Sequence, residues 1–181
     1  MLTDHEKTAL LQVARASIGA HLSSRRPPHL PGAGVSDATG VFVTIKRHGE
    51  LRGCLGVLQL RAALVEEVAR CARDSATEDP RFPPMKSDEL ADATLEISVL
   101  GPLEEIDPRD EPAIVIGRDG LVVEHGQRRG LLLPQVAVEW GWSREQFLRH
   151  TCRKAGLPDD AWAKDARVFR FSAIVFGETG R

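Results

Sequence analysis

The chain has 181 residues, of which 42% are hydrophobic and 28% charged, as is typical of a soluble globular protein with a substantial core. Its formal net charge of -2, with no basic block beyond Arg25-Arg26, argues against a protein that binds nucleic acid. No apolar run is long enough to span a membrane, and the first four residues predict a helix start rather than a secretion signal. We therefore expect no membrane association and a cytoplasmic location.

Local patterns in the first 100 residues predict two helices and three strands. Thr3 and Glu6 form a capping box, which marks the start of a helix whose apolar residues recur on one face. His48-Gly49 suits a two-residue turn between two antiparallel strands. The predicted helices cover residues 4–23 and 61–76, and the predicted strands cover residues 41–46, 50–52 and 93–100.

Beyond residue 100 short strands precede a third helix. Ser143 and Gln146 form a second capping box, and the helix that they begin is expected to end at Gly156. The predicted strands cover residues 113–117, 121–124, 130–133 and 168–176. The hairpin region, about 102–142, is expected to form a smaller lobe within a single domain of residues 1–181.

Strands and helices do not alternate as repeated βαβ units, so the order of elements favours an α+β fold. We expect a mainly antiparallel or mixed sheet that contains the strands at 41–46, 93–100 and 168–176. The helices that start near Asp4, Arg61 and Arg144 are expected to cover that sheet, because their apolar faces must be buried.

The cysteines are Cys54, Cys71 and Cys152, an odd and scattered set that suits reduced thiols better than disulfides. None of them forms a C-x-x-C pair, so we expect no structural metal site. The sequence also lacks phosphate-cradling loops, dinucleotide fingerprints and serine triads.

The most informative segment is residues 51–56, Leu-Arg-Gly-Cys-Leu-Gly, where a strand pattern ends. Gly53 and Gly56 flank Cys54 and let the backbone bend sharply or approach a ligand closely. The guanidinium of Arg52 favours the thiolate, which is the form that attacks electrophiles. The competing interpretation is a small buried residue at a tight strand end, since free cysteine is among the most buried residue types.

Two other segments could complete a site around Cys54. Arg81 lies in a proline-rich loop with Asp79, where its guanidinium could hold a carboxylate or phosphate. The alternative for this loop is a packed connector with Phe82 in the core. Glu96 lies on the polar side of its strand and either faces solvent or, if covered, becomes a candidate general acid/base.

Two candidates come from the second half of the chain. His125, in a Glu-His-Gly turn, could serve as the base for a cysteine nucleophile, or it could be a solvated turn residue. Gln135 follows the proline of a helix start and could make a polar contact with a substrate. We predict one concavity lined by residues from three separate segments, namely Arg52, Cys54, Asp79, Arg81 and Glu96.

Segment 51–56 resembles the signature of the AMMECR family, named for the Alport syndrome, midface hypoplasia and elliptocytosis chromosomal region. Other segments resemble the family in the same order, at residues 78–85, 95–100, 120–126, 130–137 and 152–157. The resemblance extends from the first helix to Phe176. The chain is similar to the bacterial and archaeal members of the family, which are called AmmeMemoRadiSam system protein A. It implies an α+β fold in which the signature segment lines a cleft beside a smaller lobe.

The resemblance also implies partners, a Memo-like protein and a radical S-adenosylmethionine protein of the same system. Radical chemistry would belong to that partner, because this chain lacks a cluster-binding cysteine triplet, and we expect no cofactor here. Two hypotheses follow. In the first, Cys54 is the nucleophile or proton donor of an enzyme for a small anionic organic substrate, which Arg52 and Arg81 orient. In the second, the chain is a scaffold, a regulatory protein or a nucleic-acid-associated binding module, and Cys54 is structural.

Overall fold

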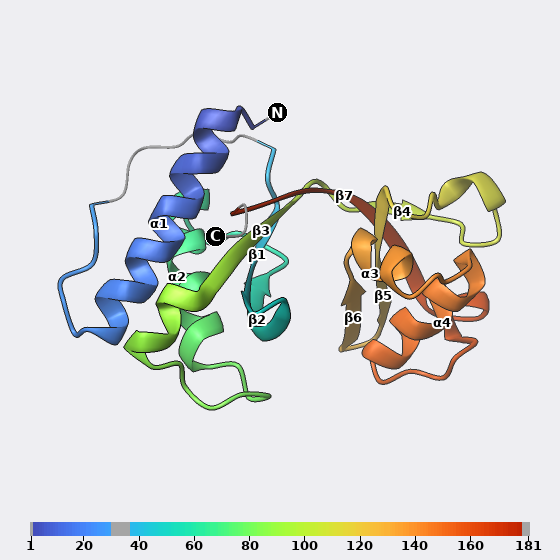
Figure 1. The fold of residues 1–181 in the computed structure, drawn as a ribbon. Helices are drawn as coiled ribbons and strands as arrows, with labels where there is room; N and C mark the ends of the chain where they lie inside the picture. Colours follow the sequence, from blue (N-terminus) through green and yellow to red (C-terminus); the bar gives the residue numbers. More distant parts are fainter. Residues whose placement is uncertain (1, 30–36, 179–181) are drawn as a thin grey trace. The chain divides into compact units, whose positions relative to one another are not determined.

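The computed structural model describes residues 2–29 and 37–178, which form two compact units (Figure 1). The first unit contains the described residues up to Leu100 and those from Ile174 onward. The second unit is Gly101–Ala173, which includes residues 102–142 and continues beyond them. Helices and antiparallel strands occur in both units, which confirms the α+β class.

The first unit consists of two helices packed on one side of an antiparallel sheet. Its strand order is β2-β1-β3, followed by the last residues of β7, and the central strand β1 pairs with β2 and β3. Helix α2 packs on β1 and β2, and α1 packs on α2 and β3. The elements are α1 (Asp4–Leu22), β1 (Gly40–Arg47), β2 (Glu50–Val57), α2 (Leu64–Thr77), the 3-10 helix η1 (Ser87–Asp92) and β3 (Ala93–Leu100).

Alternation along the strands separates a buried apolar face from the opposite face. Val41, Val43 and Ile45 of β1 are completely buried and join the core that α1 and α2 cover. The residues between them project from the opposite face, because successive side chains of a strand alternate. The face of the sheet away from the helices therefore carries Phe42, Thr44 and Lys46 of β1.

The predicted turn at His48-Gly49 is confirmed. Both residues have positive φ angles, 53° and 83°, as a type I′ hairpin turn requires. The pairing of β1 with β2 shifts between Ile45 and Lys46, and Arg52 is the extra residue of this bulge. The bulge changes which residues of β2 lie opposite β1 beyond that point.

The second unit has its own core around Phe147 and Leu148, both completely buried. Its strands are ordered β4-β7-β5-β6, and α4 packs on β5 and β6. The elements are β4 (Glu104–Ile106), η2 (Glu111–Ala113), β5 (Asp119–His125), β6 (Arg128–Leu132), α3 (Pro134–Glu139), α4 (Arg144–Lys154), η3 (Ala161–Ala163) and β7 (Arg167–Gly177), whose end belongs to the first unit.

Two predictions about this region are wrong. The helix that starts at Arg144 packs within the second unit and does not cover β1 and β3. No strand forms at residues 113–117, because the Asp119 carboxylate accepts the Val115 N–H (2.8 Å) and the Asp119 N–H donates to the Val115 carbonyl (3.0 Å). These bonds close a turn, which competes with strand pairing.

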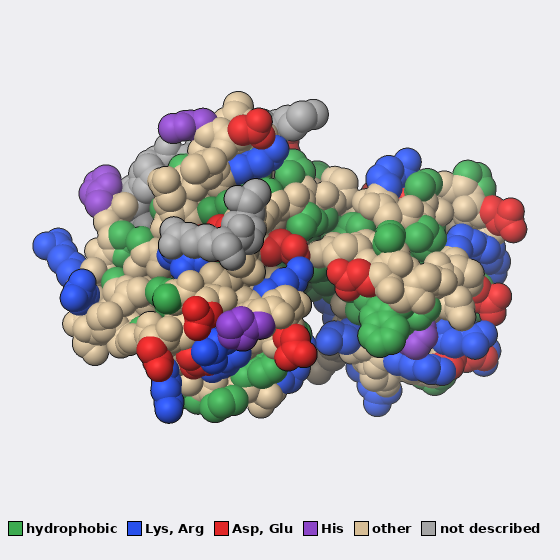
Figure 2. All heavy atoms as spheres, viewed as in Figure 1, with side chains coloured by type: hydrophobic (Ala, Val, Ile, Leu, Met, Phe, Trp, Pro, Cys, Tyr) green, Lys and Arg blue, Asp and Glu red, His purple; other side chains and the backbone are tan. Residues whose placement is uncertain are grey.

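Within the described residues no helix is both long and apolar enough to cross a membrane. On the face shown in Figure 2, positive and negative side chains are interspersed over the surface. A single-sign patch of the kind that binds a phosphate backbone is not visible on that face.

Candidate functional site

A row of three polar side chains crosses the sheet of the first unit. Thr44 of β1 lies opposite Cys54 of β2 on one side and opposite Glu96 of β3 on the other. Directly opposite residues project from the same face of a sheet. Ile45 and Leu95, the next residues along, are buried in the helix-covered core. Cys54, Thr44 and Glu96, here called the polar row, therefore project from the face away from the helices.

A hydrogen bond joins two members of the polar row, and the third forms an ion pair with Lys46. The Thr44 hydroxyl donates to the Cys54 Sγ at 3.2 Å. At the other end, the Lys46 Nζ lies 3.2 Å from the Glu96 Oε2. Cys54 and Glu96 are two strands apart, about 10 Å between their Cα atoms, since neighbouring strands are about 4.8 Å apart. A small molecule bound over Thr44 would reach both a thiol and a carboxylate.

The backbone of Cys54 is held from outside the sheet, because β2 is an edge strand. Its N–H donates to the Asp79 Oδ2 at 2.8 Å, and the next N–H, of Leu55, donates to the Ser75 Oγ at 2.8 Å. The end of α2 and the loop after it thus replace the missing neighbouring strand. An edge whose N–H groups are satisfied in this way keeps one conformation.

Asp79 connects this backbone to Arg81. Its carboxylate is 3% exposed and accepts from the Arg81 N–H (3.1 Å), Nε (2.9 Å) and Nη2 (2.7 Å). The Arg81 guanidinium, joined by the backbone N–H groups of Cys54 and Arg81, holds the pKa of Asp79 far below its usual range. The Arg81 Nη2 also donates to the Cys54 carbonyl at 3.2 Å. Asp79 is therefore ionised at neutral pH, and its carboxylate positions Arg81 and Cys54.

Burial raises the pKa of the Cys54 thiol, and it is the largest influence on this group. The Thr44 hydrogen bond and the positive charge of Arg81 lower the pKa in part, while the carboxylates of Asp79 and Glu96 raise it. The thiol is consequently protonated near neutral pH, and the expectation of a thiolate favoured by Arg52 is wrong.

Arg52 is engaged elsewhere. Its Nε and Nη2 donate to the two carboxylate oxygens of Glu89 at 3.0 and 3.1 Å, and its guanidinium lies 6.0 Å from the ring centroid of Phe82. This bidentate pair lowers the pKa of Glu89 to about 2. Arg81, not Arg52, is the arginine whose charge acts on the Cys54 thiol.

Packing inside the protein accounts for both glycines of the signature segment. A Cβ at Gly53 would lie 2.0 Å from the Ser75 carbonyl oxygen, and a Cβ at Gly56 would lie 2.3 Å from the Val41 carbonyl oxygen. Only glycine fits such close approaches of backbone. Close packing against backbone thus accounts for both glycines without a ligand. Within this segment the Cys54 side chain is held by a hydrogen bond from Thr44.

His125 and Gln135 belong to the second unit and are not part of the polar row. His125 ends β5, opposite Arg128, and is exposed. Gln135 lies in the first turn of α3, and its Oε1 is buried without a partner among the described residues. Their roles, and the concavity predicted for the five residues from Arg52 to Glu96, stay predictions.

Sequence reasoning did not identify Thr44, Lys46, Ser75 or Glu89. The available signal for Thr44 was a hydroxyl between two core residues of a predicted strand, but its partners depend on the β1–β2 register. Across the part of the chain that the structure describes, no cluster of three or more His, Cys, Asp or Glu side chains could hold a metal ion.

Comparison with known proteins supports one family throughout. The family model AMMECR1 matches residues 11–176. The chain belongs to the AMMECR1 family. A protein of Methanothermobacter thermautotrophicus is 45% identical to it over 188 aligned residues, covering 99% of this chain and 97% of that protein. Protein PF1979 of Pyrococcus furiosus is 45% identical over 181 aligned residues, covering 93% of this chain and 86% of that protein.

The AMMECR1 fold is also similar to a solved structure, the uncharacterized protein PH0010 from Pyrococcus horikoshii. The two chains have a TM-score of 0.86 and 43% sequence identity, with 94% of this chain and 90% of that chain covered. The resemblance first noted at residues 51–56 is thereby confirmed at the level of family and fold.

Proposed function

We propose that this AMMECR1 chain is an enzyme that acts on a small anionic organic molecule through Cys54. The polar row carries the proposal, because it places a thiol and a carboxylate on one face of the sheet with a hydroxyl between them. Arg52, Gly53 and Gly56 have structural roles, whereas no contact of the Cys54 side chain requires sulfur. The hydrogen bond from Thr44 could equally be accepted by a serine hydroxyl.

The state of the thiol favours a proton donor over a resting nucleophile. Burial keeps Cys54 protonated near neutral pH, and a group that holds its proton can deliver it to a bound substrate. Glu96, at the other end of the polar row, can accept a proton from the same substrate. The balanced step is a proton shift, in which Cys54 gives one proton, Glu96 receives another, and solvent restores both groups.

Arg81 supplies the contact for an anionic group. Its Nε and Nη2 hold Asp79, while Nη1 makes no hydrogen bond to any described residue, and the side chain is 51% exposed. A guanidinium nitrogen of this kind suits a carboxylate or phosphate oxygen. Together with Cys54 and Glu96, Arg81 defines a substrate that carries an anion and an exchangeable C–H or O–H group.

Hydrogen exchange in D2O tests this proposal. The protein is incubated with a library of small organic acids and phosphate esters, and mass spectrometry detects deuterium that enters a carbon position. We expect incorporation by the parent chain and by the control Cys71→Ser, and none by a folded Cys54→Ser variant. Equal incorporation by Cys54→Ser would contradict the proposal.

The second candidate is a binding module without chemistry, and the half-buried Cys54 side chain, already hydrogen-bonded by Thr44 within the sheet, favours it. The partners in either case would be the Memo-like and radical S-adenosylmethionine proteins that the AMMECR resemblance suggests. On this hypothesis the Cys54 side chain only packs and accepts the Thr44 hydrogen bond, which serine keeps, so Cys54→Ser should change the free energy of unfolding little, and neither parent nor variant should incorporate deuterium. The activity of the system formed with the Memo-like and radical S-adenosylmethionine proteins would then be unchanged in the same variant.

A further inference from the structure

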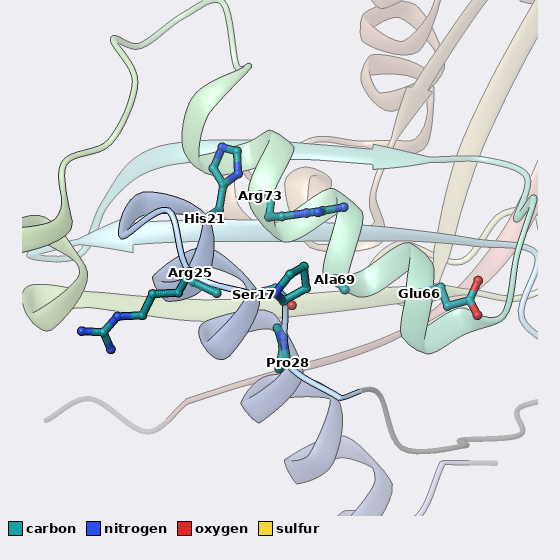
Figure 3. A pocket seen from close by; sticks show the side chains of 9 residues that line it. Ser17, His21, Arg25, Pro28, Glu66, Ala69 and Arg73 are labelled. Atoms are coloured by element: carbon teal, nitrogen blue, oxygen red, sulfur yellow. The ribbon is translucent and has the colours of Figure 1, made fainter.

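A cavity of about 240 Å³ lies in the first unit between helices α1 and α2 (Figure 3). It is a separate feature from the polar row, which projects from the face of the sheet away from these helices. Small side chains create it, since Ser17 and Ala20 of α1 face Ala69 of α2 across the helix pair. Pro27 and Pro28, just after α1, form a further wall.

The lining contains two positive groups that no described residue neutralises. Arg73 of α2 and Arg25, beyond the end of α1, make no side-chain ion pair or hydrogen bond to any residue that the structure describes. Arg70, one turn before Arg73 on the same helix, is by contrast paired with Glu67 and Asp74. Glu66 also lines the cavity, but it forms no ion pair with Arg73 among the described residues.

Figure 3 shows how these side chains lie. The Arg73 side chain extends along α2 toward Ala69, while Arg25 and Glu66 extend outward at opposite ends of the group. Ser17 lies near the middle, between the two helices. Arg73 therefore lies closer to the centre of the group than Arg25, whose side chain extends away from it.

Ser17 gives an independent indication of a missing ligand. The residue is 3% exposed, and its Oγ is buried without any hydrogen-bond partner among the described residues. A buried hydroxyl without a partner is unfavourable and uncommon in folded proteins. A ligand atom that accepts from this hydroxyl would remove the cost.

We propose that the cavity binds a short-chain carboxylate. Its carboxylate would accept from the Ser17 hydroxyl and the Arg73 guanidinium, and its carbon chain would lie against Ala20 and Ala69. The volume of about 240 Å³ suits a small molecule with a few carbon atoms. Glu66 at the edge disfavours a dianion, so carboxylate is preferred to phosphate.

A titration of the full chain with sodium butyrate tests the proposal, with NMR of the Ala20 and Ala69 methyl groups at ionic strength held constant with sodium chloride. We expect saturable shifts in the parent and binding weaker by about tenfold or more in Arg73→Gln, since a charge-assisted hydrogen bond is lost. The matched control is Arg26→Gln, because Arg26 neighbours Arg25 but does not line the cavity.

Ser17→Ala keeps the test decisive even if Arg73→Gln folds poorly. Removing a buried, unpartnered hydroxyl should leave the melting temperature unchanged or higher while weakening butyrate binding. Shifts that never saturate, equal weakening by Arg26→Gln, or undiminished binding by Ser17→Ala would overturn the proposal. Tighter binding of inorganic phosphate than of butyrate would overturn the carboxylate assignment.

Discussion

Replacing Asp79 with alanine should destabilise the first unit by an amount that can be derived from its contacts. The variant leaves the Cys54 N–H, now bonded at 2.8 Å, without an acceptor. A buried N–H without a partner costs about 1–3 kcal/mol. Arg81 is half exposed and regains water, so the lost ion pair adds only about 1 kcal/mol. We therefore expect a loss of about 2–4 kcal/mol.

Thiol labelling in a urea series measures this loss for each unit separately. Cys71 is buried in the first unit and Cys152 in the second, so mass spectrometry of labelled peptides reports where each unit opens. The free energy of unfolding falls with urea concentration by about 1–3 kcal/mol per M. The urea concentration at which Cys71 becomes half labelled should therefore fall by roughly 1 M, and that for Cys152 should shift less. Glu78→Ala is the control, because this neighbouring acid is exposed.

The effect of Asp79→Ala should also depend on pH. The folded-state pKa of Asp79 lies below its unfolded value, so its contribution is complete above about pH 4 and is lost as the pH falls further. The difference between parent and variant should accordingly shrink in acid. An unchanged Cys71 midpoint at neutral pH, or a difference that grows in acid, would refute the reasoning.

Three further predictions follow from the same region. Gly53→Ala should lower the free energy of unfolding by about 3 kcal/mol through overpacking. Gly19→Ala, whose Cβ would lie 3.5 Å from its nearest neighbour, should instead raise it by about 0.5–1 kcal/mol. Equal effects of the two variants on unfolding in urea would contradict this. Because the pKa of Glu89 is lowered to about 2, Glu89→Gln should lose stability at pH 7 and show a flatter decline of melting temperature between about pH 4 and pH 2. Alkylation of Cys54 by iodoacetamide should accelerate as the pH rises through 9, because its pKa is raised. Cys71, with a pKa raised to about 11, should react more slowly. A rate at Cys54 that does not change with pH would be inconsistent with a protonated thiol.

Local sequence signals predicted most of the secondary structure. The capping boxes at Thr3 and Ser143 and the turn at His48-Gly49 each depend on contacts within four residues, and all three are present. The prediction of a strand at residues 113–117 is wrong, because the Asp119 side chain closes a turn there. The assignment of α4 to the second unit depends on packing between distant segments, which periodicity does not reveal.

The candidate site was predictable in its segments but not in its partners. Cys54, Asp79 and Arg81 were selected from local composition, and hydrogen bonds connect all three. Arg52 was assigned to the thiol because it is near in sequence, but its bidentate partner Glu89 is 37 residues away. Thr44 lies opposite Cys54 only because of the bulge at Arg52, and a hairpin without it would place Thr44 opposite residue 53.

The most direct test of the Cys54 proposal compares two alkylating reagents that differ in charge, iodoacetate and iodoacetamide. The ratio of their rates at Cys54 is measured in the folded chain and again in concentrated urea, so the same residue serves as its own reference. A site that binds small anions through Arg81 predicts a higher iodoacetate-to-iodoacetamide ratio in the folded chain, reduced in Arg81→Lys, which cannot hold Asp79 with two nitrogens, and lost in Arg81→Gln. An equal ratio in the folded and unfolded chains would contradict the account.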